Sequence, residues 1–209
     1  MPRTLSCRNA CKSARPSKPG AVRYSPIAVK KAARALAAGG VIAHPTESVW
    51  GLACDPNNHR AVQRLLQLKD RPVAKGLILV SGEERHFAGL LDPLDERQLR
   101  QIHTTWPGPV TWLVPHCGRV PSWISGAHQS VALRCTDHPF TAALTRAFGG
   151  AIVSTSANPS GCQPARHKYQ VLRYFGDTLD FVGGGATGGR NAPSEIRDLI
   201  SGEVLRPGG

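Results

Sequence analysis

Residues 41–51, VIAHPTESVWG, join a short apolar run to a polar cluster, and residues 151–161, AIVSTSANPSG, repeat this arrangement. An apolar run of three residues is too short for a buried helix and predicts a buried strand. Similar runs predict further strands at 77–80, 111–114, 131–133 and 179–182, with two short strands at the C-terminal end. The polar residues that follow such strands are placed where loops on a sheet build ligand sites.

Stretches with helical spacing of apolar residues lie between these strands. They predict helices at 26–37, 59–69, 94–102, 139–148 and 167–175. Ser25-Pro26 supplies the N-cap and first residue of the first helix, and Gly39-Gly40 ends it. Strands mixed with helices predict an α/β or α+β fold whose helices cover the sheet. No repeat or linker divides residues 25–209, so we predict one domain there, preceded by an extension at 1–24.

The chain is strongly basic, with a formal net charge of +12 over 209 residues. This excess indicates a polyanionic partner: a nucleic acid, a nucleotide or an acidic membrane surface. Residues 1–24 contain six cations and no acid, and prolines interrupt them. We interpret them as a disordered basic extension, with a targeting or RNA-binding role as the alternative. No run approaches the roughly 18 apolar residues of a membrane span, which excludes a transmembrane protein.

Several common motifs are absent from the sequence. The six cysteines form no C-x-x-C pair, which argues against structural zinc, and isolated thiols are typical of a reducing, cytoplasmic compartment. The glycine-rich segment 183–191 resembles a phosphate-binding P-loop, but Arg190 and Asn191 replace its Lys and Ser/Thr. We interpret the eight histidines as surface or hydrogen-bonded core residues, and the three tryptophans at 106–123 as core.

Three polar clusters carry the candidate chemistry. Thr46-Glu47-Ser48 offers hydroxyls and a carboxylate, although the same residues also cap turns. Lys69, Arg71 and Lys75 suit a polyphosphate, although cations are also common at the end of a helix. The segment 154–161 offers hydroxyls and an amide for a nucleotide, although serine-rich loops are common.

Seven strings in order resemble the YrdC-like family: HPTESVWGLACDP, LLQLKDRPVAKGLIL, WPGPVTWLVP, SVALRCTDHP, VSTSANPSG, TGGRNAPSEIRDL and GEVLRPG. The resemblance covers residues 25–209. It implies a twisted mixed sheet flanked by helices around a basic cavity. It also implies the reaction of the short bacterial members, in which L-threonine, bicarbonate or CO2, and ATP give threonylcarbamoyl-AMP and diphosphate. A separate tRNA threonylcarbamoyl-transferase complex then uses the product.

The resemblance also implies roles for particular residues. Lys69 and Arg71 match the Lys-x-Arg signature and are expected to be catalytic. The expected ATP contacts are Arg71, Lys75, Ser130, Ser156, Asn158 and Arg206. The expected threonine contacts are Ser48, Arg134, Ser154 and Ser194. Longer relatives often carry a His where this chain has Val80, which leaves open how that side of the threonine is held.

The reaction that the resemblance implies requires no protein nucleophile, because in it the threonine carbamate attacks the α-phosphorus of ATP. The protein is therefore expected to supply positioning and charge neutralisation. Mg2+ is expected to bridge phosphate oxygens with few protein ligands. Two alternatives remain open: an RNA-binding module without catalysis, and another acyl- or carbamoyl-adenylate chemistry on the same fold.

Overall fold

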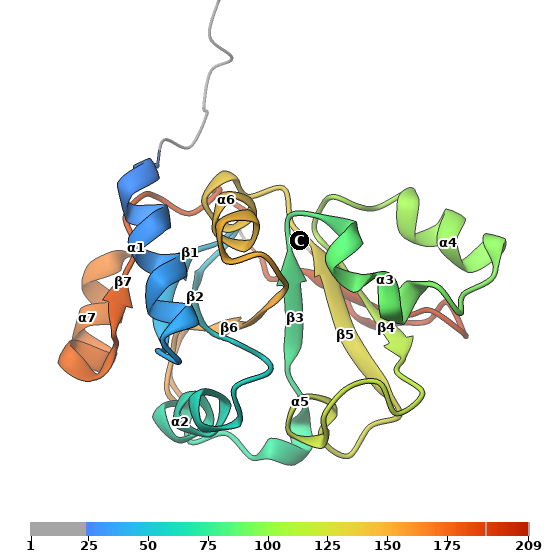
Figure 1. The fold of residues 1–209 in the computed structure, drawn as a ribbon, viewed down its shortest axis with the longest axis horizontal. Coiled ribbons are helices and arrows are strands. Elements are labelled where there is room, and N and C mark those ends of the chain that lie inside the picture. Colours follow the sequence, from blue (N-terminus) through green and yellow to red (C-terminus); the bar gives the residue numbers. More distant parts are fainter. Residues whose placement is uncertain (1–23, 191, 209) are drawn as a thin grey trace, which may run out of the picture.

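The computed structural model describes residues 24–190 and 192–208 (Figure 1). Their strands form one nine-stranded sheet in the order β7-β1-β2-β6-β3-β5-β4-β8-β9. The strands are β1 (Ile42–Pro45), β2 (Trp50–Cys54), β3 (Ile78–Ser81), β4 (Val110–Pro115), β5 (Ser130–Cys135), β6 (Ile152–Ser156), β7 (Phe181–Val182), β8 (Glu195–Asp198) and β9 (Val204–Arg206). The pairs β1/β7, β3/β5 and β4/β8 are parallel and the other five are antiparallel, so the sheet is mixed as predicted.

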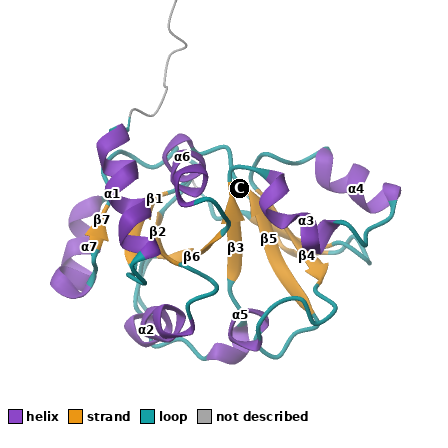
Figure 2. Ribbon diagram, in the orientation of Figure 1, coloured by secondary structure: helices purple, strands orange, loops and turns teal. Residues whose placement is uncertain are grey.

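Helices flank this sheet (Figure 2). They are α1 (Pro26–Ala37), α2 (His59–Lys69), α3 (Ala88–Leu91), α4 (Glu96–His103), α5 (Ser122–Ser125), α6 (Pro139–Phe148) and α7 (Lys168–Phe175). Three 3-10 turns complete the elements: η1 (Val73–Lys75), η2 (Glu84–Phe87) and η3 (Gly176–Thr178). The Ser25 hydroxyl accepts a hydrogen bond from the Ala28 amide, which confirms the predicted cap of α1.

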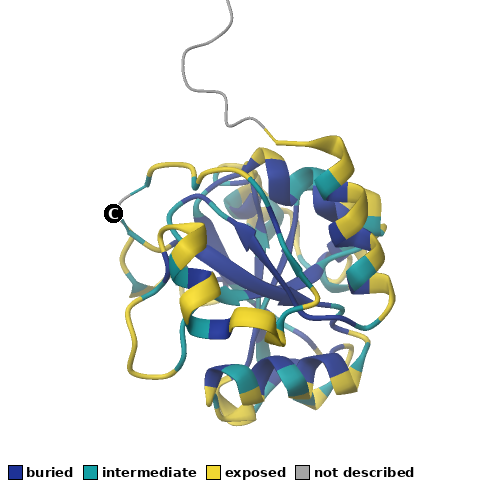
Figure 3. Ribbon diagram, turned by 90° about the vertical axis from the view of Figure 1, so that its left-hand side faces the viewer, coloured by how far each residue is buried: buried dark blue, intermediate teal, exposed yellow. Residues whose placement is uncertain are grey.

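Two apolar clusters lie on opposite faces of the sheet, because successive side chains of a strand point to opposite sides. Ile42 and Ala53 pack with α1 and α6 in the smaller cluster. Val41, Ala43 and Leu52 belong to the larger cluster, which also contains α2 and the buried residues of β4 and β5. Figure 3 shows the buried strands at the centre, with exposed helix surfaces around them.

No strand was predicted at residues 50–54, and the structure has one there. Trp50–Cys54 is a strand whose five residues are all buried, and it forms an antiparallel hairpin with β1. A half-exposed strand is marked by alternating apolar and polar residues. A strand that is buried on both faces lacks this alternation, so the sequence of residues 50–54 did not indicate a strand. Glycine suits position 51 of this strand because an added Cβ would come within 3.1 Å of His44 Nε2 and of Ser154 Oγ.

The boundary of the strand predicted at 151–153 is also corrected. Strand β6 extends to Ser156 because Ser154 pairs with Ala53 and Ser156 pairs with Gly51. Ser154 and Ser156 therefore lie in a strand and not in a loop after it. The other predicted helices and strands are present with shifts of a few residues at their ends.

Trp106 and Trp112 are core residues, as predicted, and Trp123 packs against the core. Within the described part of the chain, no helix is both long and apolar enough to cross a membrane. The interpretation of residues 1–24 as a basic extension concerns residues 1–23, which lie outside the described residues.

Candidate active site

A cavity of about 420 Å³ lies on the sheet where β2, β6, β3 and β5 run side by side. Its walls come from the β1–β2 turn, the segment around η1, strands β5 and β6, and the C-terminal strands. Nine of the eleven site residues expected from sequence line it: Ser48, Arg71, Lys75, Ser130, Arg134, Ser154, Ser156, Ser194 and Arg206. The cavity lining contains four cations from three separate segments and a single carboxylate, Glu47.

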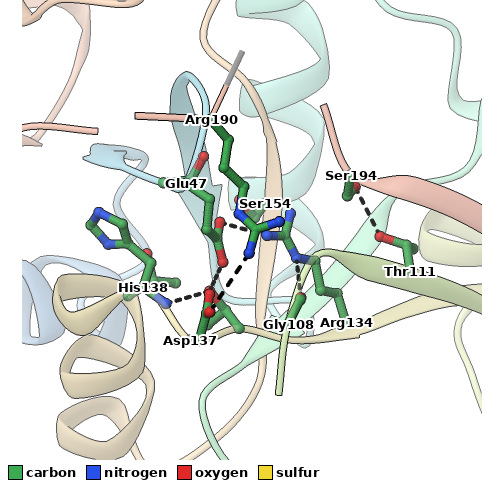
Figure 4. A network of polar contacts seen from close by, with 12 residues as sticks. Glu47, Gly108, Thr111, Arg134, Asp137, His138, Ser154, Arg190 and Ser194 are labelled. Carbon is green, nitrogen blue, oxygen red and sulfur yellow. Dashed lines mark hydrogen bonds and ion pairs between the residues drawn. The ribbon is translucent and has the colours of Figure 1, made fainter. Parts of the chain in front are cut away.

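Arg134 and Glu47 form an ion pair in the wall of this cavity. The distance from Arg134 Nη2 to Glu47 Oε2 is 2.6 Å, and only 12% and 7% of the two side chains are exposed. The Arg134 Nε also donates to the Gly108 carbonyl oxygen at 3.2 Å. These contacts hold the guanidinium in one orientation (Figure 4).

Glu47 remains ionised although it is buried. Burial acts to raise the pKa of Glu47, but the charge of Arg134 and a hydrogen bond from the Thr136 hydroxyl outweigh it. The pKa of Glu47 therefore lies below its ordinary value. Glu47 and Thr136 were not among the residues expected from sequence. The carboxylate in the cluster 46–48 was a signal, but its partner Arg134 is far away in the sequence.

Ser154 is oriented by a buried histidine. His44 is fully buried, with its Nδ1 3.1 Å from the Thr141 hydroxyl and its Nε2 3.3 Å from the Ser154 hydroxyl. Burial, and to a lesser extent the nearby His138, lowers the pKa of His44 to about 4. A neutral imidazole therefore faces Ser154 at neutral pH, which confirms His44 as a hydrogen-bonded core residue.

Ser194 and Arg206 hold each other on the opposite wall. Arg206 Nη2 donates to the Ser194 carbonyl oxygen at 2.7 Å, and the Thr111 hydroxyl donates to the Ser194 hydroxyl at 3.0 Å. Burial, together with the charge of Arg134, lowers the pKa of Arg206. The guanidinium groups of Arg206 and Arg134 are thus close enough to influence each other in one cavity.

Arg71 and Lys75 enter the cavity from the segment around η1. The Arg71 Nη2 donates to the Gly76 carbonyl oxygen at 2.9 Å, while its buried Nε has no partner among the described residues. Burial lowers the pKa of Arg71. Arg71 lines the cavity, so its positive charge is placed to attract an anionic ligand.

Lys69 and Asn158 are not brought to the lining of the cavity. Lys69 is 5% exposed, and its Nζ donates to the backbone oxygens of Ser156 and, at 2.8 Å, Asn158. Burial and the nearby Arg71 lower the pKa of Lys69 to about 8. The Asn158 Nδ2 donates to two backbone oxygens, and its buried Oδ1 has no partner among the described residues. In this structure Lys69 fixes the segment 156–158, and its expected contact with phosphate remains a prediction.

Two further expectations concern His138 and Val80. His138 is buried, and its Nε2 lies 3.4 Å from the Ala186 carbonyl oxygen, so it is a hydrogen-bonded core residue as predicted; its Nδ1 has no partner among the described residues. Val80 lines the cavity and pairs with Arg134 in the β3/β5 register. An apolar side chain therefore stands beside the guanidinium at the position where longer relatives often have His.

The chemistry of the lining does not suit direct metal binding. In the described ranges, no three His, Cys, Asp or Glu residues are grouped to hold a metal ion. Glu47, the carboxylate of the cavity, is occupied by Arg134 and Thr136. A cation that enters with a phosphorylated ligand would depend on the oxygens of that ligand and on water.

This fold and site define an α/β domain with a basic cavity on its sheet. A family model described as "Telomere recombination", that of Sua5, YciO and YrdC, matches residues 34–208. The chain belongs to the Sua5/YciO/YrdC family.

Curated relatives and solved structures agree with this assignment. The chain is 58% identical over 179 residues to a threonylcarbamoyl-AMP synthase of Stutzerimonas stutzeri, covering 86% of this chain and 96% of the relative. It is 55% identical over 179 residues to a threonylcarbamoyl-AMP synthase of Cellvibrio japonicus, and the match covers 86% of this chain and 95% of that relative. These relatives are named as enzymes.

The structure of P. abyssi Sua5 complexed with L-threonine superposes with a TM-score of 0.81 at 29% identity. It covers 90% of this chain, which spans 56% of that longer protein. The structure of E. coli YciO shares the fold, with a TM-score of 0.75 at 21% identity. The superposition covers 88% of this chain and 90% of the YciO chain.

Proposed function

We propose that this chain is a threonylcarbamoyl-AMP synthase, a nucleotidyltransferase that joins L-threonine, bicarbonate and ATP. The observation that carries the proposal is the convergence of Arg71, Lys75, Arg134 and Arg206 on one cavity. Its relatives at 55% and 58% identity bear that name, and the related Sua5 structure contains L-threonine.

The threonine side of the cavity is the wall of Ser48, Arg134, Ser154 and Ser194. Arg134 would hold the amino-acid carboxylate, since a guanidinium oriented by Glu47 and Gly108 offers a fork of donors. Val80 beside it would contact the threonine methyl group. The neutral His44 leaves the Ser154 hydroxyl free of a charged neighbour, which suits a contact to the threonine side chain.

The nucleotide side is the wall of Arg71, Lys75, Ser130, Ser156 and Arg206. Cations on both sides, Arg71 and Lys75 on one and Arg206 on the other, would neutralise the triphosphate. Asn158 and Lys69 would support this wall by shaping the segment 156–158. We propose Lys69 as a positioning residue unless ATP draws its ammonium group away from the backbone oxygens.

The reaction then needs no group of the protein as nucleophile. The threonine amine and bicarbonate form a carbamate and water, and the carbamate oxygen attacks the α-phosphorus of ATP with diphosphate as leaving group. The chain contributes orientation and fixed positive charge in a partly closed cavity. Mg2+ bound to the phosphates would offset their charge, with oxygens of ATP and water as its ligands. We further propose that a tRNA threonylcarbamoyl-transferase complex consumes the product in the cytoplasm.

The test is mass spectrometry of products from ATP, bicarbonate and L-threonine, with diphosphate release measured in parallel. We expect threonylcarbamoyl-AMP and diphosphate from the wild type. Arg134→Ala should lose at least 100-fold in turnover, on the scale of one lost oxyanion donor. Arg173→Ala, on the exposed surface of α7, is the matched control and should retain wild-type turnover.

Two outcomes would contradict the proposal. RNA binding without threonine-dependent ATP consumption would favour the RNA-binding module. Equal turnover with serine, alanine or another amino acid in place of threonine would favour a different carbamoyl-adenylate chemistry.

A further inference from the structure

A second cavity of about 240 Å³ adjoins the threonine wall. Glu47, Ser48, Arg134, Pro193 and Ser194 line both cavities, so the two spaces meet at the Arg134–Glu47 pair. The remaining lining residues are Pro109, Arg190, Ala192, Glu195 and Gly208. This space is below the roughly 300 Å³ of typical drug-sized ligand sites, so it suits a much smaller molecule than a nucleotide.

The glycine-rich segment that is not a P-loop contributes Arg190 to the lining of this second cavity. The Gly188 amide donates to the Thr46 carbonyl oxygen at 2.9 Å, and the Arg190 amide donates to the Glu47 carbonyl oxygen at 3.0 Å. An added Cβ at Gly188 would come within 3.0 Å of Glu47 Cα, so glycine permits this close approach. The backbone of Arg190 is thereby fixed next to Glu47.

Of the two arginines that line the second cavity, Arg190 has the weaker contact with a carboxylate. Glu47 is paired with Arg134, and Glu195 is paired with Arg197. Arg190 Nη2 lies 3.9 Å from Asp137 Oδ2, beyond hydrogen-bond distance, and 39% and 47% of these side chains are exposed. Figure 4 shows the Arg190 side chain reaching from its segment toward Asp137, in the same network as Glu47 and Arg134.

We propose that the second cavity binds bicarbonate, with Arg190 as its principal cation and the Ser48 and Ser194 hydroxyls as further donors. This inference deepens the proposed function, on which it rests. A small oxyanion there would lie next to the wall that holds threonine, where the amine must capture it. The carbon–nitrogen bond forms between the threonine amine and bicarbonate, and water leaves: R-NH2 + HCO3− gives R-NH-COO− + H2O. Both carboxylates of the lining are paired with other arginines, so the charge of Arg190 favours the anion over uncharged CO2.

The test varies one substrate at a time at saturating concentrations of the other two. Arg190→Gln removes the charge and keeps much of the side-chain length. We expect the KM for bicarbonate to rise about tenfold, the loss of one charge-assisted hydrogen bond, while the KM values for ATP and threonine stay within twofold. Arg190→Lys should recover part of the affinity, and Arg173→Gln on α7 should match the wild type.

Ala192→Trp places a large side chain in the second cavity without removing a charge. It should also raise the KM for bicarbonate, and nitrate, a planar oxyanion, should compete with bicarbonate in the wild type but much less in Arg190→Gln. Rapid mixing without carbonic anhydrase should show turnover from bicarbonate with no lag.

Several results would overturn the inference. They are an unchanged bicarbonate KM in both variants, an equal rise in the KM for threonine or ATP, or a lag from bicarbonate that carbonic anhydrase removes. Absence of threonine-dependent diphosphate release in the wild type would instead refute the proposed function. The wild-type assay therefore distinguishes failure of the proposed function from failure of the bicarbonate site.

Discussion

The carboxylate of Glu47 and the guanidinium of Arg134 meet at 2.6 Å, although 87 positions separate them in the sequence. The pair lies between the two cavities and lines both. It therefore sets the orientation of Arg134, the cation that we propose holds the threonine carboxylate. Removing one partner by mutation leaves the other charged, buried and unpaired. This lowers the free energy of unfolding much more than the loss of an exposed ion pair does.

Glu47→Gln should impair threonine binding more than ATP binding. The amide keeps the size and one acceptor oxygen for Thr136 but removes the charge that orients Arg134. We expect the KM for threonine to rise about tenfold or more and the KM for ATP to change less than threefold. Steady-state kinetics measure both, and Glu96→Gln, whose partner Arg100 is exposed and far from both cavities, is the matched control. Equal effects on the two KM values would show that Glu47 acts on the fold as a whole.

His44 should make the fold less stable in mild acid. Its folded pKa of about 4 lies below the unfolded value near 6.5, so between these values the unfolded chain binds more protons. The free energy of unfolding therefore falls as pH decreases through this window, by up to about 1.4 kcal/mol per pH unit. Urea unfolding from pH 7 to pH 4 measures the slope.

His44→Gln is the comparison for that slope, because it retains His138 and Glu47, which also titrate or carry charge nearby. The difference in stability between wild type and His44→Gln should change with pH across the window. Parallel curves would contradict a depressed pKa at His44.

Lys69→Met should separate positioning from direct phosphate contact. Removing the ammonium leaves the backbone oxygens of Ser156 and Asn158 without their donor, at about 1–3 kcal/mol for each unsatisfied group. Thermal or urea unfolding should show this loss, and diphosphate release should fall roughly 100-fold.

Arg71→Ala provides the contrast, because its guanidinium also faces the cavity. It should raise the KM for ATP with little loss of stability. A Lys69→Met variant with wild-type stability and a raised KM for ATP would place the ammonium on phosphate and not on the backbone.

Gly126→Ala should disturb the nucleotide wall from outside the cavity lining. Gly126 has a φ of +64°, and an added Cβ would come within 2.5 Å of the Ala74 carbonyl oxygen and 2.6 Å of the Gly76 amide nitrogen. The segment carrying Lys75 must then move. We expect a loss of about 1–3 kcal/mol of stability and a raised KM for ATP.

Gly118→Ala is the matched control for this effect. Its φ of +74° is similar, but no atom lies within 4 Å of the added Cβ. It should cost about 1–2 kcal/mol from backbone conformation alone and leave the KM for ATP unchanged. Equal ATP kinetics in the two variants would show that the contact with Ala74 and Gly76 has no bearing on the site.

The sequence by itself determined the fold class, most of the elements and nine of the residues that line the cavity. Helix α1 is an example, because a capping serine, a first-turn proline and helical spacing are local signals. The family strings carried the site residues, since each binding segment is short and contiguous in the chain.

Tertiary structure alone decided what each polar group contacts. Strand β2 has no alternation, so the sheet and not its own sequence defines it. Lys69 matches a signature, yet its ammonium contacts two backbone oxygens almost 90 residues away in the chain. The Glu47–Arg134 pair and the second cavity beside it arise only when the β1–β2 turn, β5 and the segment before β8 are packed together. Burial and long-range pairing, which set charge states and orientations, are properties of that packing and not of any single segment.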